Sequence, residues 1–142
     1  MSKAFPFGRE RRIRRRADFL RVQAIGERAT SRHFVMLVAA REDGTEARMQ
    51  PSRLGIVATR KVGDATMRNR IKRVCRECFR LWPGFVPDGI DLVVIARSGA
   101  DELPLATVRD EWSAARAVVL KRCAKVLAAS GAVAKEASSS GP

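Results

Sequence analysis

One segment of the chain, residues 68–80, sorts its side chains onto two opposite sides when it is read as a helix. At roughly 100° per residue, one side collects Ile71, Val74, Cys75, Cys78 and Phe79. The other side collects Asn69, Lys72, Arg73, Arg76 and Arg80. Glu77 falls at the edge of the cationic side, so no acid interrupts the row of cations. The pattern therefore predicts an amphipathic helix that packs its apolar side on a protein core and presents the other to an anionic partner.

The positive charge of the chain is large and is confined to its first 80 residues. The formal net charge is +13 over 142 residues, and the pI is near 11.3. Residues 1–80 contain 21 Lys and Arg against 8 Asp and Glu, whereas residues 81–142 contain 7 of each kind. A charge that served solubility alone would have no reason to stop there. The clustering indicates a protein that binds nucleic acid.

The rest of the sequence predicts one RNA-binding domain over residues 17–130, between a basic flexible arm at 1–16 and a disordered tail at 131–142. Apolar periodicity predicts a first helix over 18–29, which Gly26 weakens or ends, and a last helix over 105–129. Apolar runs predict strands over 33–40, 54–59 and 90–96. The predicted order is helix, strand, strand, basic helix, strand, helix. We therefore expect an α+β fold, a small mixed sheet of three to four strands with helices on one side.

Few residues could carry catalysis or hold a metal. Cys75 and Cys78 form a CxxC pair, but both would lie mid-helix on the apolar side, so we expect them in the core. Only Cys123 and His33 remain as further zinc ligands. His33 is the only histidine, and it starts a predicted strand with no acid beside it. The sequence therefore predicts no catalytic protein side chain and no metal site, which argues against a protein nuclease.

The chain has no segment that indicates export or membrane insertion. Its first sixteen residues are basic and lack the apolar stretch of a secretory signal. The longest apolar run, residues 34–40, is too short to span a bilayer. Three cysteines without a disulfide spacing are typical of a reducing compartment. We expect a cytoplasmic protein without membrane association.

The segment 53–73 resembles the signature of the protein subunit of bacterial ribonuclease P. That signature reads R-x-G-hydrophobic-x-x-x-[KR]-K-x-G and continues A-x-x-R-N-[RK]-hydrophobic-[KR]-R-x-x-R. The matching residues are Arg53, Gly55, Lys61, Gly63, Ala65, Arg68, Asn69, Lys72, Arg73 and Arg76. The flanks are similar as well, through Arg15, Asp18, Phe19 and residues 91–97, so the resemblance covers residues 9–127.

The resemblance implies that an RNA subunit is the catalyst and removes the 5′ leader of precursor tRNA with Mg²⁺. The protein would be a small cofactor that needs no obligate protein partner. It implies a ribosomal-protein-like fold whose basic helix lies in a left-handed βαβ crossover, against the usual hand. The residues that would bind the catalytic RNA are Arg68, Asn69, Arg70, Lys72, Arg73, Arg76 and Arg80.

The resemblance also implies a separate cleft, between the first helix and one face of the sheet, that holds the single-stranded leader. Its residues here would be Phe19, Gln23, Val35, Leu37, Val57, Arg60 and Lys61. Gln23 and Leu37 stand where relatives often carry aromatic rings, and each lost stacking partner weakens binding by about 1–3 kcal/mol. The alternative is a general RNA-binding or ribosome-associated protein without a role in tRNA processing, which would not prefer leader-bearing tRNA.

Overall fold

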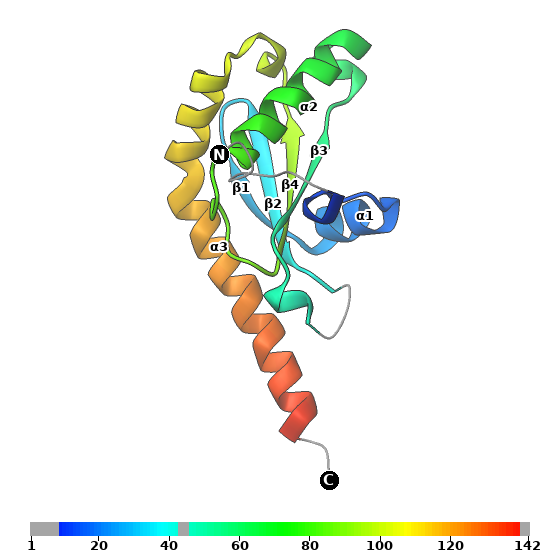
Figure 1. Cartoon of the computed structure of the whole chain (residues 1–142), viewed down its shortest axis with the longest axis vertical. Coiled ribbons are helices and arrows are strands. Elements are labelled where there is room, and N and C mark those ends of the chain that lie inside the picture. The colour runs from blue at the N-terminus through cyan, green and yellow to red at the C-terminus, as the bar shows by residue number, and fades with distance from the viewer. Residues whose placement is uncertain (1–8, 43–45, 140–142) are drawn as a thin grey trace.

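The computed structural model describes the backbone of residues 9–42 and 46–139. Within these residues the helices are α1 (Arg16–Ile25), α2 (Ala65–Arg80) and α3 (Leu105–Ser139). The strands are β1 (Glu27–Thr30), β2 (Phe34–Ala40), β3 (Arg53–Val57) and β4 (Ile90–Ala96). Short 3₁₀ turns connect them, namely η2 (Arg9–Arg11), η3 (Ala47–Met49), η4 (Arg60–Val62) and η5 (Ala100–Glu102). Figure 1 shows these elements on one small sheet, with α3 continuing beyond it.

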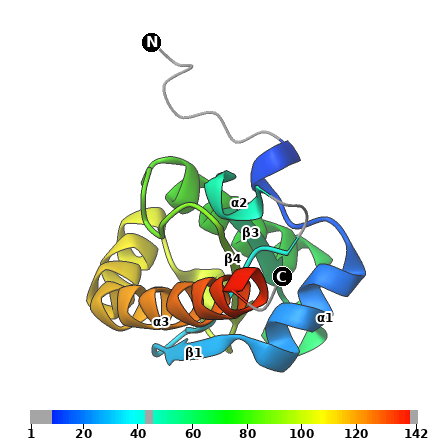
Figure 2. The same cartoon turned by 90° about the horizontal axis from the view of Figure 1, so that it is seen from below.

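The four strands form one mixed sheet in the order β1-β2-β4-β3. β1 pairs with β2 and β2 with β4 in antiparallel fashion, whereas β3 and β4 are parallel neighbours. The chain between these two parallel strands forms α2, so β3, α2 and β4 make a βαβ unit. In Figure 1 both strands run upward, β4 lies to the left of β3, and α2 passes in front of them, as Figure 2 also shows. The crossover is therefore left-handed, and the expected mixed α+β architecture is confirmed.

The sheet separates two apolar cores of unequal size. On one face α2 and α3 pack over the larger core, whose bulkiest fully buried side chains are Trp112, Phe34 and Phe79. On the other face α1 and the residues before it cover a smaller core of Ile13, Val22, Leu37, Ala39 and Val93. The expectation that the helices share one side is therefore wrong, because α1 lies on the opposite face (Figure 2). This face is only partly covered, which leaves room for a cleft.

The first helix ends earlier than the sequence predicts, and the residues after it form the edge strand β1. At Gly26 a Cβ atom would lie 2.3 Å from the carbonyl oxygen of Val22, so only glycine fits where the chain leaves the helix. Ala29 then turns into the core and is 5% exposed. The prediction of one helix over 18–29 is therefore wrong after Ile25, and the sheet has four strands.

A buried carboxylate fixes α1 to the sheet. Asp91, the second residue of β4, has no exposed surface and accepts hydrogen bonds from Arg53 of β3 at 2.7 and 2.8 Å. Arg21 of α1 donates to the same carboxylate at 2.5 Å and to the carbonyl oxygen of Ala40 at 2.9 Å. Buried charges are stable only when they are paired and hydrogen-bonded. The network therefore ties α1 to β2, β3 and β4 together.

The ends of the described chain are more regular than the sequence predicts. The backbone N–H of Ile13 donates to Leu54 of β3 at 3.0 Å, and Ile13 is 5% exposed, so this part of the predicted basic arm is docked on the sheet. At the other end α3 continues past Ala129 to Ser139, into the segment predicted as a tail. Residues 1–8 and 140–142 of the predicted arm and tail lie outside the described residues. No helix in the described part of the chain is both long and apolar enough to cross a bilayer.

Candidate nucleic-acid interface

The basic helix forms as its periodicity predicts, and its two sides separate cleanly. Asp64 caps the N-terminus of α2, where its side chain accepts a hydrogen bond from the backbone N–H of Met67 at 3.0 Å. The buried residues of α2 are Ile71, Cys75, Cys78 and Phe79. These residues hold the helix on the larger core, so the cations on its opposite side face outward. The helix itself therefore displays the predicted RNA-binding residues.

Two of the predicted cations are already engaged by the protein. Arg70 donates to the carbonyl oxygens of Asp101 and Leu103 at 2.7 and 3.1 Å, which ties α2 to η5. Arg80 makes a two-pronged ion pair with the carboxylate of Glu77, at 2.8 and 2.7 Å. The expectation that no acid interrupts the cationic row is therefore wrong at the C-terminal end of α2. The uncompensated charge lies further up the helix.

The central part of the helix carries that charge. Asn69 and Arg73 are exposed, and Arg68, Lys72 and Arg76 are half-buried. Lys72 and Arg73 form no hydrogen bond or ion pair with the rest of the described chain. We call the surface formed by these five residues the α2 surface. A row of cations without acids suits a phosphate backbone, because each phosphate that it neutralises releases counterions and so favours binding.

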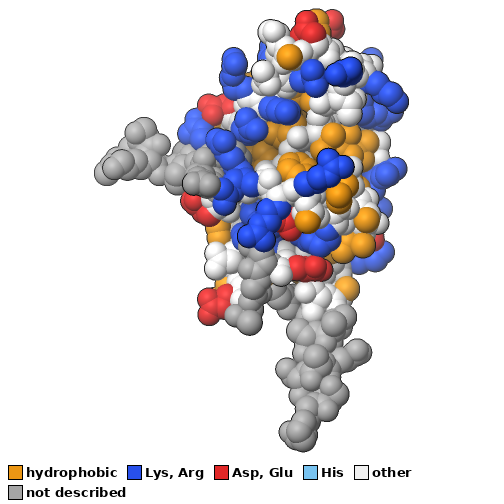
Figure 3. Space-filling model, turned by 90° about the vertical axis from the view of Figure 1, so that its right-hand side faces the viewer, with side chains coloured by type: hydrophobic (Ala, Val, Ile, Leu, Met, Phe, Trp, Pro, Cys, Tyr) orange, Lys and Arg blue, Asp and Glu red, His pale blue; other side chains and the backbone are white. Residues whose placement is uncertain are grey.

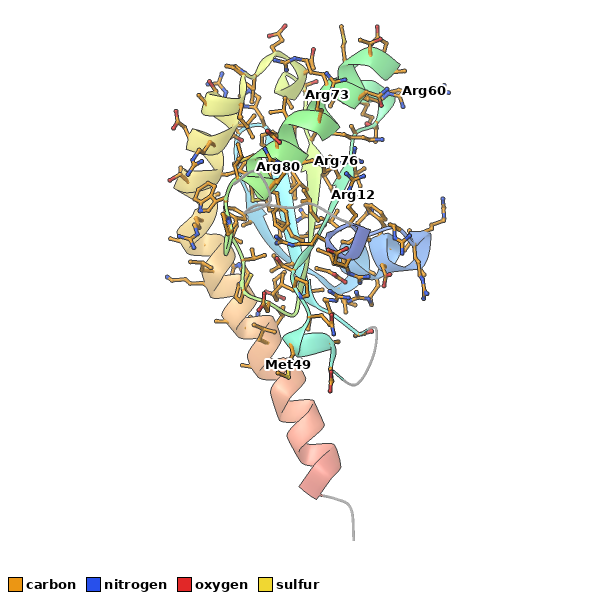
Figure 4. All side chains as sticks on the ribbon, in the orientation of Figure 1. Arg12, Met49, Arg60, Arg73, Arg76 and Arg80 are labelled. Carbon is orange, nitrogen blue, oxygen red and sulfur yellow. The ribbon has the colours of Figure 1, made fainter. Side chains whose placement is uncertain are left out.

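A further arginine, Arg12 in the segment before α1, lies next to the α2 surface. Figure 4 shows Arg12 beside Arg76, with Arg73 above Arg76 and Arg80 to its left. Burial, and then the nearby charge of Arg12, lower the pKa of Arg76 from its ordinary value. Like charges that converge in this way repel each other, so an anion between them would be stabilised.

A hollow lies where α1 leaves the sheet open, and three of the residues predicted for the leader cleft, Phe19, Gln23 and Val57, line it. Its volume is about 400 Å³, and its lining residues are Arg14, Arg16, Phe19, Leu20, Gln23 and Val57. Phe19 packs its ring against Gly55 of β3, where a Cβ atom would lie 2.5 Å from the ring. The glycine of the motif therefore makes room for the aromatic ring, which is half-buried and has an edge in the hollow. We call this region the α1 cleft.

The floor of the α1 cleft differs from the prediction at two positions: one predicted residue is absent from it, and one residue that was not predicted is present. Val35, Ile95 and Val57 are direct neighbours across β2, β4 and β3, and all three are half-buried on this face. Leu37 is only 3% exposed, so the structure contradicts it as a surface contact. Sequence reasoning missed Ile95, because only the strand register places it between the two predicted valines. The floor is a short apolar row that suits an unstacked base or a ribose.

Basic residues gather where β3 and β4 end. Arg60 and Lys61 follow β3, as predicted, and both are exposed. Arg97 directly follows β4 and is also exposed, and its side chain donates to the carbonyl oxygen of Ser31 at 3.1 Å. Because β3 and β4 are parallel, these cations lie at the same end of the sheet. The sequence did not single out Arg97, since its position depends on that pairing.

A further hollow connects the two surfaces along the edge of β3. It has a volume of about 430 Å³ and is lined by Arg12, Ile13, Arg14, Phe19, Leu54, Gly55, Ile56, Lys72 and Arg76. We call it the edge hollow. Figure 3, which views the side of the molecule that carries α1 and β3, shows Lys and Arg side chains distributed around apolar patches. The α2 surface and the α1 cleft are therefore parts of one basic face.

The cysteines and the histidine have structural surroundings. All three cysteines are buried and free, and burial raises the pKa of Cys78 and of Cys123 to about 12. The Nδ1 atom of His33 lies 2.7 Å from the carboxylate of Glu111, which joins the start of β2 to α3. No group of three or more potential metal ligands is found among the described residues. These residues therefore hold the core and its helices together.

Comparison with known proteins identifies the same family throughout. A family model described as Ribonuclease P matches residues 7–120. A ribonuclease P protein component from Thermotoga sp. (strain RQ2) is 45% identical over 96 residues, which are 68% of this chain and 77% of the relative. One from Oleidesulfovibrio alaskensis is 41% identical over 93 residues, 66% of this chain and 71% of that relative.

Solved structures agree with the sequence comparison. The RNase P protein from Thermotoga maritima superposes with a TM-score of 0.62 at 39% identity, covering 78% of this chain and 96% of the other. The RNase P protein from Staphylococcus aureus gives a TM-score of 0.65 at 28% identity, covering 77% and 94%. The matched residues include all of β1–β4, α1 and α2. With its basic helix, open sheet face and motif in register, the chain belongs to the ribonuclease P protein family.

Proposed function

We propose that this chain binds the catalytic RNA of ribonuclease P through the α2 surface and the 5′ leader of precursor tRNA through the α1 cleft. The observation that carries the proposal is the α2 surface, where Lys72 and Arg73 are uncompensated by any acid in the described chain. An extended surface of uniformly positive charge matches an RNA backbone. The affinity of the protein for RNA should therefore fall steeply as the salt concentration rises. Asn69 adds a directional hydrogen bond.

The chemistry would belong to the RNA subunit and its Mg²⁺, in a ribonucleoprotein endoribonuclease. The role of the protein would be electrostatic and positional. Two polyanions, the catalytic RNA and the precursor, repel each other, and a basic protein between them reduces that repulsion. We therefore expect the protein to lower the concentration of Mg²⁺ that cleavage requires.

The α1 cleft would distinguish precursor from mature tRNA, since only the precursor has a leader. Its floor of Val35, Ile95 and Val57 offers apolar surface, and Phe19 offers one ring edge. Arg60 and Lys61 stand at the end of that floor and can contact phosphates. Proteins that bind single-stranded RNA without sequence preference use this combination of apolar contact and positive charge.

The alternative, a general RNA-binding or ribosome-associated protein, has no observation in its favour. It would not explain an apolar cleft with a basic rim beside the α2 surface. We expect the protein to act in the cytoplasm, where precursor tRNA is processed, without an obligate protein partner.

The test is reconstitution of precursor tRNA cleavage with a bacterial ribonuclease P RNA at low Mg²⁺. We expect this chain to raise the cleavage rate and to increase the affinity for precursor over mature tRNA. Equal stimulation of leader-bearing and leaderless substrates would support the alternative. No effect on cleavage would refute the proposal.

A further inference from the structure

The segment Arg12–Arg15, which precedes α1, contributes to the lining of three hollows on the basic face. Arg14 lines the α1 cleft and the edge hollow, and it also lines a third hollow of about 600 Å³ beside the N-terminus of α1. Arg12 lines the last two of these. The segment therefore stands between the α1 cleft and the α2 surface rather than outside them.

The segment is held in place by Ile13. Its N–H bonds to Leu54 at 3.0 Å, its side chain is 5% exposed, and it belongs to the small core under α1. The neighbouring Arg12 forms a parallel bridge with Leu54, so the backbone here is extended along β3. In an extended segment alternate side chains point to opposite sides. Burial of Ile13 therefore turns Arg12 and Arg14, both exposed, away from the core.

The edge hollow brings cations from two elements around an apolar floor. Arg12 and Arg14 come from the segment before α1, and Lys72 and Arg76 come from α2. The floor is provided by β3 and by the Phe19 ring, which packs against Gly55. Apolar surface ringed by cations fits a nucleotide of a single strand, since only an unstacked strand offers both its phosphate and an apolar face.

We propose that the edge hollow binds a leader nucleotide between the ribozyme and the α1 cleft, with Arg14 contacting its phosphate and Ile13 acting as the positioning residue. The proposal rests on the proposed function above. If α2 holds the catalytic RNA and the α1 cleft holds the leader, the strand that joins them must cross the edge of β3. The edge hollow lies on that path and shares the Phe19 ring with the α1 cleft.

The experiment measures binding of precursor tRNA to the reconstituted holoenzyme, using leaders in which one phosphate at a time is replaced by an uncharged methylphosphonate. We expect substitution at one or two adjacent leader positions to weaken the binding of the precursor roughly fivefold each, which is the effect of about one net hydrogen bond. In Arg14→Ala the same positions should show no further loss. The salt slope of leader-dependent binding should fall by about 0.7, the value for one contact to a single strand.

Matched variants distinguish the contact made by Arg14 from a general loss of positive charge. Arg28→Ala removes one exposed arginine from β1, at the other edge of the sheet, and should keep the full methylphosphonate effect. Ile13→Ala should behave like Arg14→Ala although it removes no charge, and Ile13→Val should restore the effect. If Ile13→Ala fails to fold, Arg14→Ala alone still decides the assignment of the phosphate.

The outcomes distinguish this inference from the proposed function. A holoenzyme with Arg14→Ala that retains the methylphosphonate effect would overturn the edge hollow as a leader site. Weaker binding of the catalytic RNA by Arg14→Ala, with unchanged leader dependence, would place the segment in the ribozyme interface and would also overturn it. In both cases wild-type protein would still stimulate cleavage, whereas failure of the proposed function would abolish stimulation in every variant.

Discussion

Glu77→Gln should strengthen the binding of this protein to the catalytic RNA, because it removes the negative charge that neutralises Arg80. In the free protein the guanidinium of Arg80 donates to both carboxylate oxygens of Glu77. The hydrogen bond from Arg80 lowers the pKa of Glu77, so the carboxylate is charged at neutral pH and the pair is neutral. The glutamine variant keeps the size of the side chain and removes its charge. The net positive charge beside the α2 surface then rises by one.

The size of the effect follows from counterion release. One more phosphate contact steepens the dependence of log K on log salt by about 0.9 for a duplex. Between 1 M and 0.1 M salt, a change of about 0.9 in this slope amounts to roughly eightfold in affinity. Arg80→Ala should cost much less than Arg73→Ala, since Arg80 is neutralised by Glu77 and Arg73 has no acid partner in the described chain.

The assay is a titration of labelled catalytic RNA with each variant at several salt concentrations. The order of slopes expected is Glu77→Gln steepest, then wild type and Arg80→Ala, then Arg73→Ala. The reasoning is refuted if Arg80→Ala loses as much slope as Arg73→Ala, or if Glu77→Gln leaves the slope unchanged.

Three further predictions concern the cleft, the buried carboxylate and the acid limit of stability. Phe19→Ala should lower the preference for precursor over mature tRNA, by about 1–3 kcal/mol for a lost stacking contact, while affinity for the catalytic RNA stays within twofold or so; equal losses in both assays would contradict a separate cleft. Asp91→Asn should reduce the free energy of unfolding in urea by about 3–5 kcal/mol, because it removes the buried negative charge that pairs with both Arg21 and Arg53, whereas Asp88→Asn, an exposed control, should have little effect. Burial alone would raise the pKa of Glu111, but hydrogen bonds that include those from His33 lower it below the ordinary value of 4.5. Its contribution to stability is therefore present above that value and is lost as the pH falls through the lowered pKa, so Glu111→Gln should flatten the loss of stability in acid, and an unchanged profile of urea midpoint against pH would count against it.

The elements that the sequence predicted best are those whose signal is local. β4 occupies Ile90–Ala96, the range predicted from one apolar run, and α2 ends at Arg80, the last residue of the segment with helical periodicity. β1 escaped prediction because its four residues, Glu27–Thr30, are short and mostly polar. They are a strand only because β2 pairs with them. The apolar stripe of the preceding helix stops at Ile25, just before Gly26, but nothing in the sequence indicated a strand directly after it.

The candidate site divides in the same way. The cations of α2 follow from helical periodicity, and Phe19 followed from the motif. Ile95 in the cleft floor, the engagement of Arg70 by η5 and the docking of Ile13 on β3 all depend on residues distant in sequence. Contacts between residues so far apart in the sequence cannot be predicted from a local sequence pattern. The burial of Leu37 likewise depends on how far α1 extends across the sheet.

The way α1 is held has a consequence for its dynamics. Val22 is the only fully buried residue of this helix, and the remaining attachment comes from the half-buried Phe19 ring and from the ion pair between Arg21 and Asp91. α2, by contrast, places four residues in the main core. Local opening is easiest where few apolar contacts are lost. In hydrogen exchange, the amides of α1 should therefore exchange before those of α2, and RNA that spans the cleft should slow them, so that substrate capture completes the packing of this helix.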